Sequence, residues 1–216
     1  DVLGDQSSAV YSGDYQMSDN VYDEGQDKVL FIYNGASQYG YAVVGTVSGN
    51  SISFGTPTAF ISSTTAYFTA VYDPDNAKTA IFFNDQGDSN QQKAIVATIS
   101  GTSVSFGSVV TFSTTNSGTP SKDSTYDTSE NKILVAYTDT SSSSKIVAAT
   151  ISGTDISFGT PVEFLSTDVN EVTIQYDTNA DKSLVAYRNS NNSNNIDSRV
   201  VSLSGTSVTL GTETSL

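Results

Sequence analysis

The sequence predicts an all-β protein, and within that class a β-propeller of four four-stranded antiparallel blades of about 52 residues, or an arc of a larger propeller. Two motifs, each present in four copies, recur in step along the chain, and no segment carries the 3.6-residue apolar period of a helix. The first motif alternates apolar and polar residues before a glycine and repeats every 52 residues, at Ile52-Ser53-Phe54-Gly55, Val104-Ser105-Phe106-Gly107, Ile156-Ser157-Phe158-Gly159 and Val208-Thr209-Leu210-Gly211.

The second motif is a Tyr-Asp pair followed by Lys five residues after the Asp, at Tyr22-Asp23…Lys28, Tyr72-Asp73…Lys78, Tyr126-Asp127…Lys132 and Tyr176-Asp177…Lys182. The two motifs together divide a single domain, residues 1–216, into approximate repeats 12–60, 61–112, 113–164 and 165–216. Residues 1–11 resemble the end of one further strand that precedes the first repeat.

Each repeat predicts four strands, A to D, in order. Strand A ends at the Tyr-Asp pair, as in residues 66–73, and strand B is a continuous apolar run such as residues 132–137, typical of a strand covered on both faces. Strand C corresponds to residues 93–100, and Gly101 supplies the positive φ that a tight C–D hairpin needs. Strand D alternates apolar and polar residues, and Gly107 after it predicts a β-bulge.

A lone sheet of this kind leaves two apolar faces in water, and stacking the units face to face buries them. Both chain ends carry D-like strands, at residues 2–11 and 208–216, whereas a closed ring needs only one for its last blade. The chain is therefore either an arc of a longer array or a unit whose surplus strand pairs with a neighbouring subunit, since an unpaired edge favours self-association.

Composition excludes several classes of function. With no His and no Cys, the chain has no Ser-His-Asp triad, thiolate metal site or disulfide. A net charge of −14 disfavours binding to nucleic acid and to anionic lipid, and no apolar run approaches the length of a membrane span. We expect no enzymatic activity, no cofactor and no resident metal.

Differences in repeat length indicate which end of the blades binds a partner. The A–B and C–D turns are constant in length, whereas the B–C and D–A loops vary, and in an up-and-down blade these variable loops share one face. The polar residues expected there as ligand-binding candidates are Asn34, Tyr39, Asn84, Asp85, Asp88, Asn90, Asp139, Asn189 and Asn194. Unconstrained drift of exposed loops explains the same variation.

Three motifs suggest metal binding, catalysis or glycosylation, and each is weighed against a simpler structural explanation. The acidic A–B turns, such as residues 73–76, offer oxygen ligands to calcium, but turn formation with an Asp–Lys pair across the hairpin explains them more simply. Asp85 and Asp88, on one B–C loop, could reach the spacing that glycosidase chemistry needs, but their counterparts in other repeats are not acidic pairs. Asn191-Asn192-Ser193 matches the glycosylation pattern, a weak signal in an Asn- and Ser-rich loop.

The repeat, with Tyr-Asp-x4-Lys followed by Ala-Ile-Val-x-Thr-Ile-Ser-Gly-Thr-Ser-Val-Ser-Phe-Gly, resembles tandem repeats of marine microbes and their viruses. These include structural or tail-appendage proteins of cyanophages and large secreted proteins of aquatic bacteria, and the resemblance covers residues 15–216. It implies a non-enzymatic structural or adhesion module on a virion or outside a cell, with protein subunits or surface glycans as partners. A carbohydrate-binding lectin is the alternative, and a glycan-active enzyme is the third hypothesis.

Overall fold

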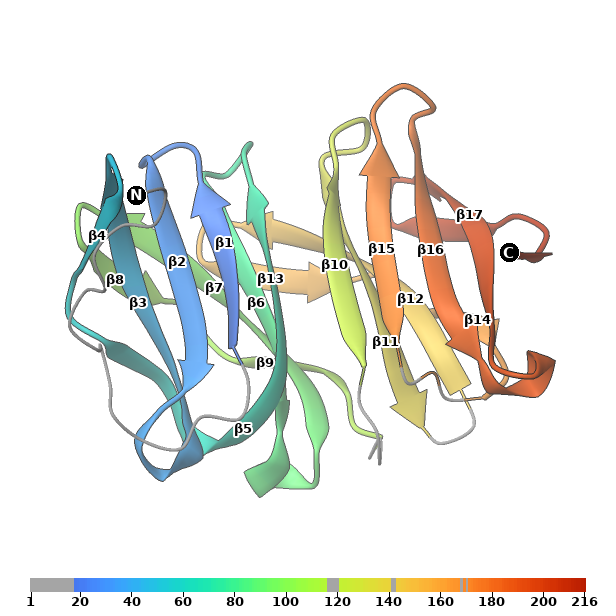
Figure 1. The fold of residues 1–216 in the computed structure, drawn as a ribbon, viewed down its shortest axis with the longest axis horizontal. Coiled ribbons are helices and arrows are strands. Elements are labelled where there is room, and N and C mark those ends of the chain that lie inside the picture. The colour runs from blue at the N-terminus through green and yellow to red at the C-terminus, as the bar shows by residue number, and fades with distance from the viewer. Residues whose placement is uncertain (1–17, 116–120, 141–142, 168, 170) are drawn as a thin grey trace.

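The computed structural model describes residues 18–115, 121–140, 143–167, 169 and 171–216, and these form antiparallel sheets (Figure 1). Each of four units contains an inner strand A, then strands B, C and D in sequence order. Unit 1 contains β1 (Ser18–Asp23), β2 (Lys28–Asn34), β3 (Tyr39–Ser48) and β4 (Ser51–Phe54). Unit 2 contains the second part of β5 (Thr58–Asp73), then β6 (Lys78–Asp85), β7 (Gln91–Ser100) and β8 (Ser103–Phe106).

Units 3 and 4 repeat this order. Unit 3 contains β10 (Lys122–Asp127), β11 (Lys132–Thr140), β12 (Ser143–Ser152) and β13 (Asp155–Phe158). Unit 4 contains β15 (Val172–Asp177), β16 (Lys182–Asn189), β17 (Asn195–Ser204) and β18 (Ser207–Leu210). After each D strand the chain returns to pair again with strand C of the same unit, through the first part of β5, β9 (Val110–Ser113), β14 (Val162–Leu165) and β19 (Thr214–Ser215).

The A–B turns are held by the Asp of the Tyr-Asp motif. In unit 2, Asp73 Oδ1 accepts hydrogen bonds from the backbone N–H groups of Asp75 and Asn76 at 3.0 and 3.1 Å. Asp73 and Lys78 lie opposite each other across the hairpin, as the sequence suggested, but their side chains form no ion pair among the described residues. Lys78 Nζ donates to the carbonyl of Ala77, the other motif lysines also donate to turn carbonyls, and the Asp caps the turn instead.

Glycine positions in the D region follow the predicted chemistry. Gly101 and its counterparts in the C–D turns adopt φ of 58 to 64°. Ala97 of β7 pairs with Phe106, and Ala94 of β7 pairs with Val110. Between these two pairs the chain that contains Gly107 has one residue more than β7. This excess is a β-bulge, as the sequence predicted.

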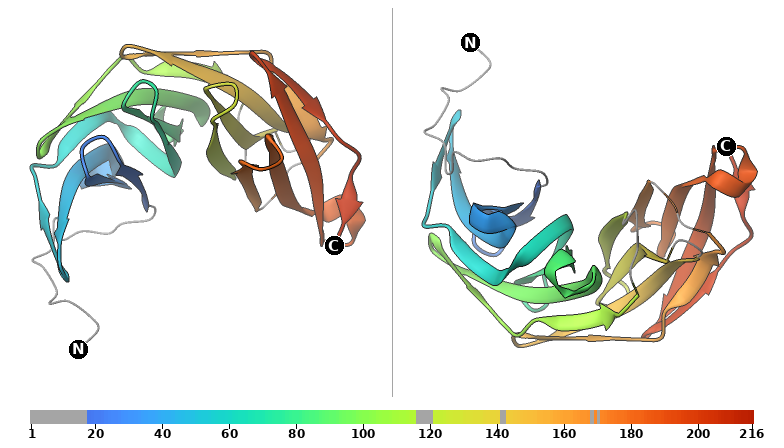
Figure 2. Two further views of the ribbon diagram at one scale, coloured as in Figure 1. Left: turned by 90° about the horizontal axis from the view of Figure 1, so that it is seen from above. Right: turned by 90° about the horizontal axis from the view of Figure 1, so that it is seen from below.

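The four units lie side by side along an open arc, with the first and fourth at opposite ends (Figure 2). Their inner strands β1, β5, β10 and β15 are successive neighbours. β5 joins two units directly, because its first part pairs with β3 and its second part with β6. The all-β class is confirmed, and the only helical segments among the described residues are three 3₁₀ turns of three residues each.

The core consists of three apolar layers between consecutive units. We call the side of each sheet that carries Leu30, Ala80, Leu134 or Leu184 the following face, and the opposite side the preceding face. Leu134 on the following face of unit 3 packs in one cluster with Val185 and Val201 on the preceding face of unit 4. The same combination of faces forms the layers between units 1 and 2 and between units 2 and 3, so stacking buries what one sheet alone exposes.

Polar groups fix neighbouring inner strands. Asp19 Oδ2 accepts from Ala70 N at 2.8 Å, and Asp123 Oδ2 accepts from Ile174 N at the same distance. Between units 2 and 3 the hydroxyl groups of Thr69 and Ser124 lie 3.0 Å apart. Side-chain carboxylate and hydroxyl groups therefore link each inner strand to the next.

The partial strand expected at residues 1–11, and the intermolecular pairing expected there, lie outside the described residues. Within the described ranges no helix is long and apolar enough to cross a membrane.

Candidate functional site

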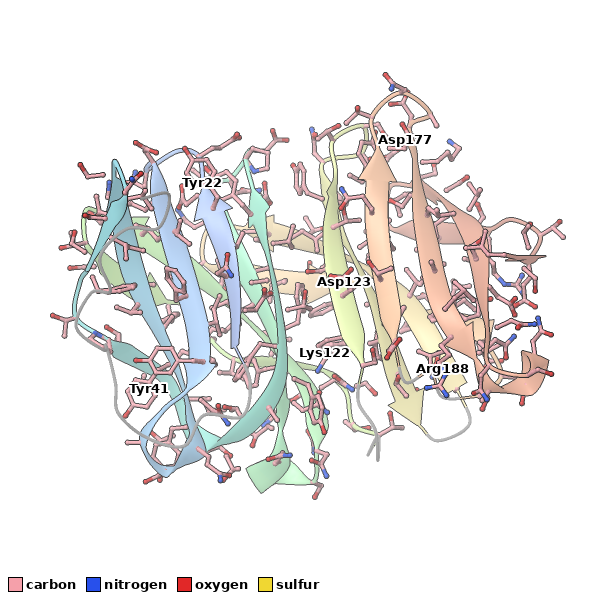
Figure 3. The ribbon with its side chains drawn as sticks, viewed as in Figure 1. Tyr22, Tyr41, Lys122, Asp123, Asp177 and Arg188 are labelled. Carbon is pink, nitrogen blue, oxygen red and sulfur yellow. The ribbon has the colours of Figure 1, made fainter. Side chains whose placement is uncertain are left out.

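The B–C and D–A loops gather at one end of the units, which we call the loop face. Tyr22 and Asp177 lie toward the opposite, turn end, whereas Tyr41, Lys122 and Arg188 lie toward the loop face (Figure 3). This separation follows from the antiparallel order of the strands, which places B–C and D–A connections at the same end.

In unit 2, the predicted carboxylates Asp85 and Asp88 share one ammonium group. Lys93 Nζ lies 2.7 Å from Asp85 Oδ2 and 2.6 Å from Asp88 Oδ2, and Ser63 donates to the other oxygen of Asp85. Asp85 is buried, and Asp88 is half exposed. Burial opposes the charge on Lys93, but hydrogen bonds to the two carboxylates outweigh it and raise the pKa of the amine. The cluster closes the B–C hairpin.

Unit 3 contains the same arrangement around Asp139. Its carboxylate is buried and accepts hydrogen bonds from Lys145, Ser113 and Thr115. Burial alone would raise the pKa of Asp139, but these hydrogen bonds outweigh it and hold the pKa below its usual range. The residue therefore anchors the return strand β9 to the B–C hairpin.

In unit 4 the positions of the hydrogen-bond donor and the carboxylate are exchanged. Asn189 replaces the buried Asp, and its side chain donates to Asp197 Oδ2 at 2.7 Å, at the position that Lys occupies in units 2 and 3. Asn192 and Ser215 also donate to Asp197. The hydrogen bond from Ser215, followed by those from the two amides, lowers the pKa of Asp197.

The remaining predicted residues also have internal hydrogen-bonding roles or loop positions. Asn34 is buried and donates to the carbonyl of Thr65 in the next unit, at 3.5 Å. Asn84 is buried, donates to the carbonyl of Asn90 and accepts from Lys122 Nζ. The carbonyl of Tyr39 accepts from Gly35 N, and Asn194 is exposed with φ of 62°.

Lys122 is a further amine near this face. It sits at the start of β10 and donates to the carbonyl of Tyr67 at 2.9 Å as well as to Asn84. Burial lowers the pKa of this amine well below its ordinary value. The contacts join units 2 and 3, so Lys122 acts as an inter-unit link.

One groove on the loop face leaves polar groups open to solvent. We call it the β14–β17 groove; it has a volume of about 590 Å³ and lies between unit 3 and the B–C loop of unit 4. Its lining is Glu163, Phe164, Leu165, Ser166, Asn189, Asn191, Asn192, Arg199 and Glu213. Two of these residues, Asn191 and Asn192, belong to the 3₁₀ turn η3 (Ser190–Asn192).

Arg199 supplies the positive charge of this groove. One terminal nitrogen lies 3.3 Å from Glu213 Oε2, and the other donates to the carbonyl of Gly211 at 3.2 Å. Its Nε is buried and has no hydrogen-bond partner among the described residues. The hydroxyl of Tyr187 donates to the same Glu213 oxygen at 2.5 Å. Hydrogen bonds to Glu213 and Gly211 therefore hold the guanidinium in a fixed orientation beside the amides and carboxylates of the groove, and its unpaired Nε is buried.

Sequence reasoning predicted Asn189 but missed the charged residues of the groove, Glu163, Arg199 and Glu213. A signal was present: Arg199 occupies the strand C position that is Val43, Ile95 and Val147 in the other units. A charged side chain at an otherwise apolar repeat position marks a site with a different role.

The described residues contain no cluster of three or more His, Cys, Asp or Glu side chains suited to a metal ion. In the A–B turns, which invited a calcium hypothesis, Asp oxygens accept hydrogen bonds from turn amides, as for Asp127 with Ser129 and Glu130.

Comparison with known proteins defines no family for this chain. No family model matches it, and no curated protein matches it. Among solved structures, a triple arginine-to-alanine mutant of AofleA from Arthrobotrys oligospora is similar, with 10% identity and a TM-score of 0.45 over 91% of this chain and 73% of that chain. At that identity and TM-score the likeness is distant.

Proposed function

We propose that this chain is an arc of a β-propeller that serves as a non-enzymatic adhesion or assembly module on a virion or outside a cell, and that its loop face is the binding surface. The repeat order, the stacking of sheets and the inner row of A strands support the propeller interpretation. The resemblance to marine viral and bacterial repeats supports the location.

The way the carboxylates are used supports a non-enzymatic role. A glycosidase needs one carboxyl group as proton donor and one as nucleophile or base. Asp85 and Asp88 instead bind the same ammonium of Lys93, and Asp139 is held by three donors. These groups stabilise hairpins, and a proton-transfer role would break those contacts.

The observation that carries the binding role is the polar lining of the β14–β17 groove, where Arg199 lies among the amides Asn191 and Asn192 and the carboxylate of Glu163. Amide, carboxylate and guanidinium groups in a shallow groove suit a ligand with many hydroxyl groups, such as a surface glycan. The groove is polar and carries Asn191, Asn192 and Glu163 within reach of the same space. A glycan is therefore the ligand class that this site fits.

A glycan array with the fluorescently labelled protein tests this role. We expect binding to a subset of glycans that is lost in Arg199→Ala and weakened in Asn192→Ala. Lys182→Ala removes the same charge from an A–B turn at the opposite end and is the matched control, which keeps binding. Binding that persists in Arg199→Ala, or no binding to any glycan, would contradict the ligand class.

A further inference from the structure

The fourth unit exposes an apolar face that every other unit buries. Leu184 is 48% exposed, whereas the same repeat position is fully buried in the other units, at Leu30, Ala80 and Leu134. Val200 is 47% exposed, and its counterparts Val44, Val96 and Ala148 are fully buried. Ile196 on the same strand is also exposed. The following face of unit 4 therefore has the composition of an interface and no neighbour in the described structure.

The first unit also exposes side chains on its preceding face that the other units bury. Val47 is 60% exposed, whereas its counterparts Ile99 and Ile151 are 5% and 4% exposed in the layers between units. Tyr22 is 54% exposed, although its counterpart Tyr176 is 7% exposed and Tyr72 receives a hydrogen bond from Gly25 N of the preceding unit. These are the two halves of the contact that joins consecutive units.

Glycine at position 211 gives an independent indication. A Cβ at Gly55 or Gly107 would lie 2.0 Å from the carbonyl oxygen of Thr102 or Thr154 in the C–D turn of the next unit. These positions require glycine because the neighbouring backbone approaches so closely. At Gly211 the nearest atom to such a Cβ lies at 3.5 Å and belongs to Val200 of the same unit. Gly211 therefore leaves room for the C–D turn of a following unit, although no such turn lies there in the described structure.

A hollow of about 420 Å³ on the same face has a counterpart that is filled inside the arc. Its lining includes Thr173, Ala186, Arg188 and Ile196. Arg188 occupies the repeat position of Thr138, which donates to the carbonyl of Val169 in the next unit at 3.0 Å. Val169 is fully buried in the layer between units 3 and 4. The hollow on unit 4 is thus the place where the D–A segment of a following unit would bind.

We propose that the following face of unit 4 binds the preceding face of unit 1 in a second copy of this chain, head to tail. The contact continues the established interface between units, with Leu184 and Val200 against the side that carries Val47 and Tyr22. Such a contact is heterologous, so it closes into a ring or extends into a filament. It joins sheet faces, which distinguishes it from pairing of terminal strand edges.

Sedimentation velocity on residues 1–216, over a range of concentrations and at raised salt, tests the contact. Salt is included because copies of net charge −14 repel each other. We expect reversible oligomers, and we expect Val200→Asp or Val47→Asp to weaken association by at least about tenfold, because each buries a charge without a partner. Val109→Asp, also at an exposed valine but on neither face, is the matched control and keeps association.

Mixing the two variants separates this contact from any other. Val200→Asp keeps an intact unit 1 face and Val47→Asp an intact unit 4 face, so at a concentration where each alone is monomeric the mixture forms a one-to-one dimer. Gly211→Ala, which meets nothing closer than 3.5 Å in the isolated chain, leaves the melting temperature of the monomer unchanged and also weakens association. A wild type that stays monomeric at every concentration, variants that still associate, or a mixture that forms no dimer would overturn the proposal.

Discussion

Gly107→Ala measures how tightly units 2 and 3 are packed. The added Cβ would lie 2.0 Å from the carbonyl oxygen of Thr154 and 3.0 Å from its carbonyl carbon. A carbon–oxygen contact without a hydrogen bond needs more than about 3 Å, so the two backbones must separate by roughly 1 Å. Overpacking of this kind costs about 1–3 kcal/mol, and backbone cannot move aside as a side chain can. We expect the free energy of unfolding to fall by that amount or more.

Urea denaturation followed by tyrosine fluorescence and by far-UV circular dichroism measures the change. For a chain of this size the melting temperature falls by about 2–4 °C per kcal/mol. Gly211→Ala is the control at the same repeat position without the approaching carbonyl, and its stability should equal that of the wild type when both are monomeric. Equal stability of Gly107→Ala and Gly211→Ala would refute the packing argument.

Two ionisable groups give further predictions. Asp139→Asn should lower the free energy of unfolding by about 1–3 kcal/mol near neutral pH, because a buried acceptor of three hydrogen bonds is lost. The folded pKa of Asp139 is lowered, so the extra stability of the wild type is present above the ordinary pKa of 3.8 and disappears as pH falls through the folded pKa. Urea denaturation of both proteins at several acidic pH values measures this. A difference in the free energy of unfolding that stays constant with pH would contradict it. Burial lowers the pKa of Lys122, so the unfolded chain binds more protons there and wild-type stability should rise with pH toward the ordinary lysine value of 10.5, relative to Lys122→Met. A pH-independent difference between these two proteins, measured by urea denaturation from about pH 7 to about pH 10, would contradict the assignment.

The strand pattern could be read from the sequence because each unit repeats the same local rules. Motif spacing located the A–B turn at Asp73 to Lys78, the positive φ at Gly101 and the bulge after Gly107. The division of each D strand into two short pieces, the second of which is β14 (Val162–Leu165) in unit 3, was not predicted, since four residues carry too little periodicity to separate a strand from a loop.

The candidate site was less predictable, because its residues depend on contacts across distant parts of the chain. Asp85 and Asp139 were chosen as polar loop residues, yet their partners Lys93 and Lys145 lie on the next strand and neutralise them. Composition reports that a loop is polar, but it does not report whether those polar groups are already paired. Arg199 was hidden for the opposite reason, since it lies within a strand.

β5 has a mechanical consequence for the arc. This strand of 16 residues is hydrogen-bonded to unit 1 through residues 58–64 and to unit 2 from Thr65 onward, and its left-handed residue, Tyr67, lies at a register shift within the part that pairs with β6. Units 1 and 2 are therefore coupled through shared backbone, whereas units 3 and 4 have separate return and inner strands, β14 and β15. Any bending or twisting that the module undergoes under load will concentrate away from β5, so the first two units move as one rigid segment.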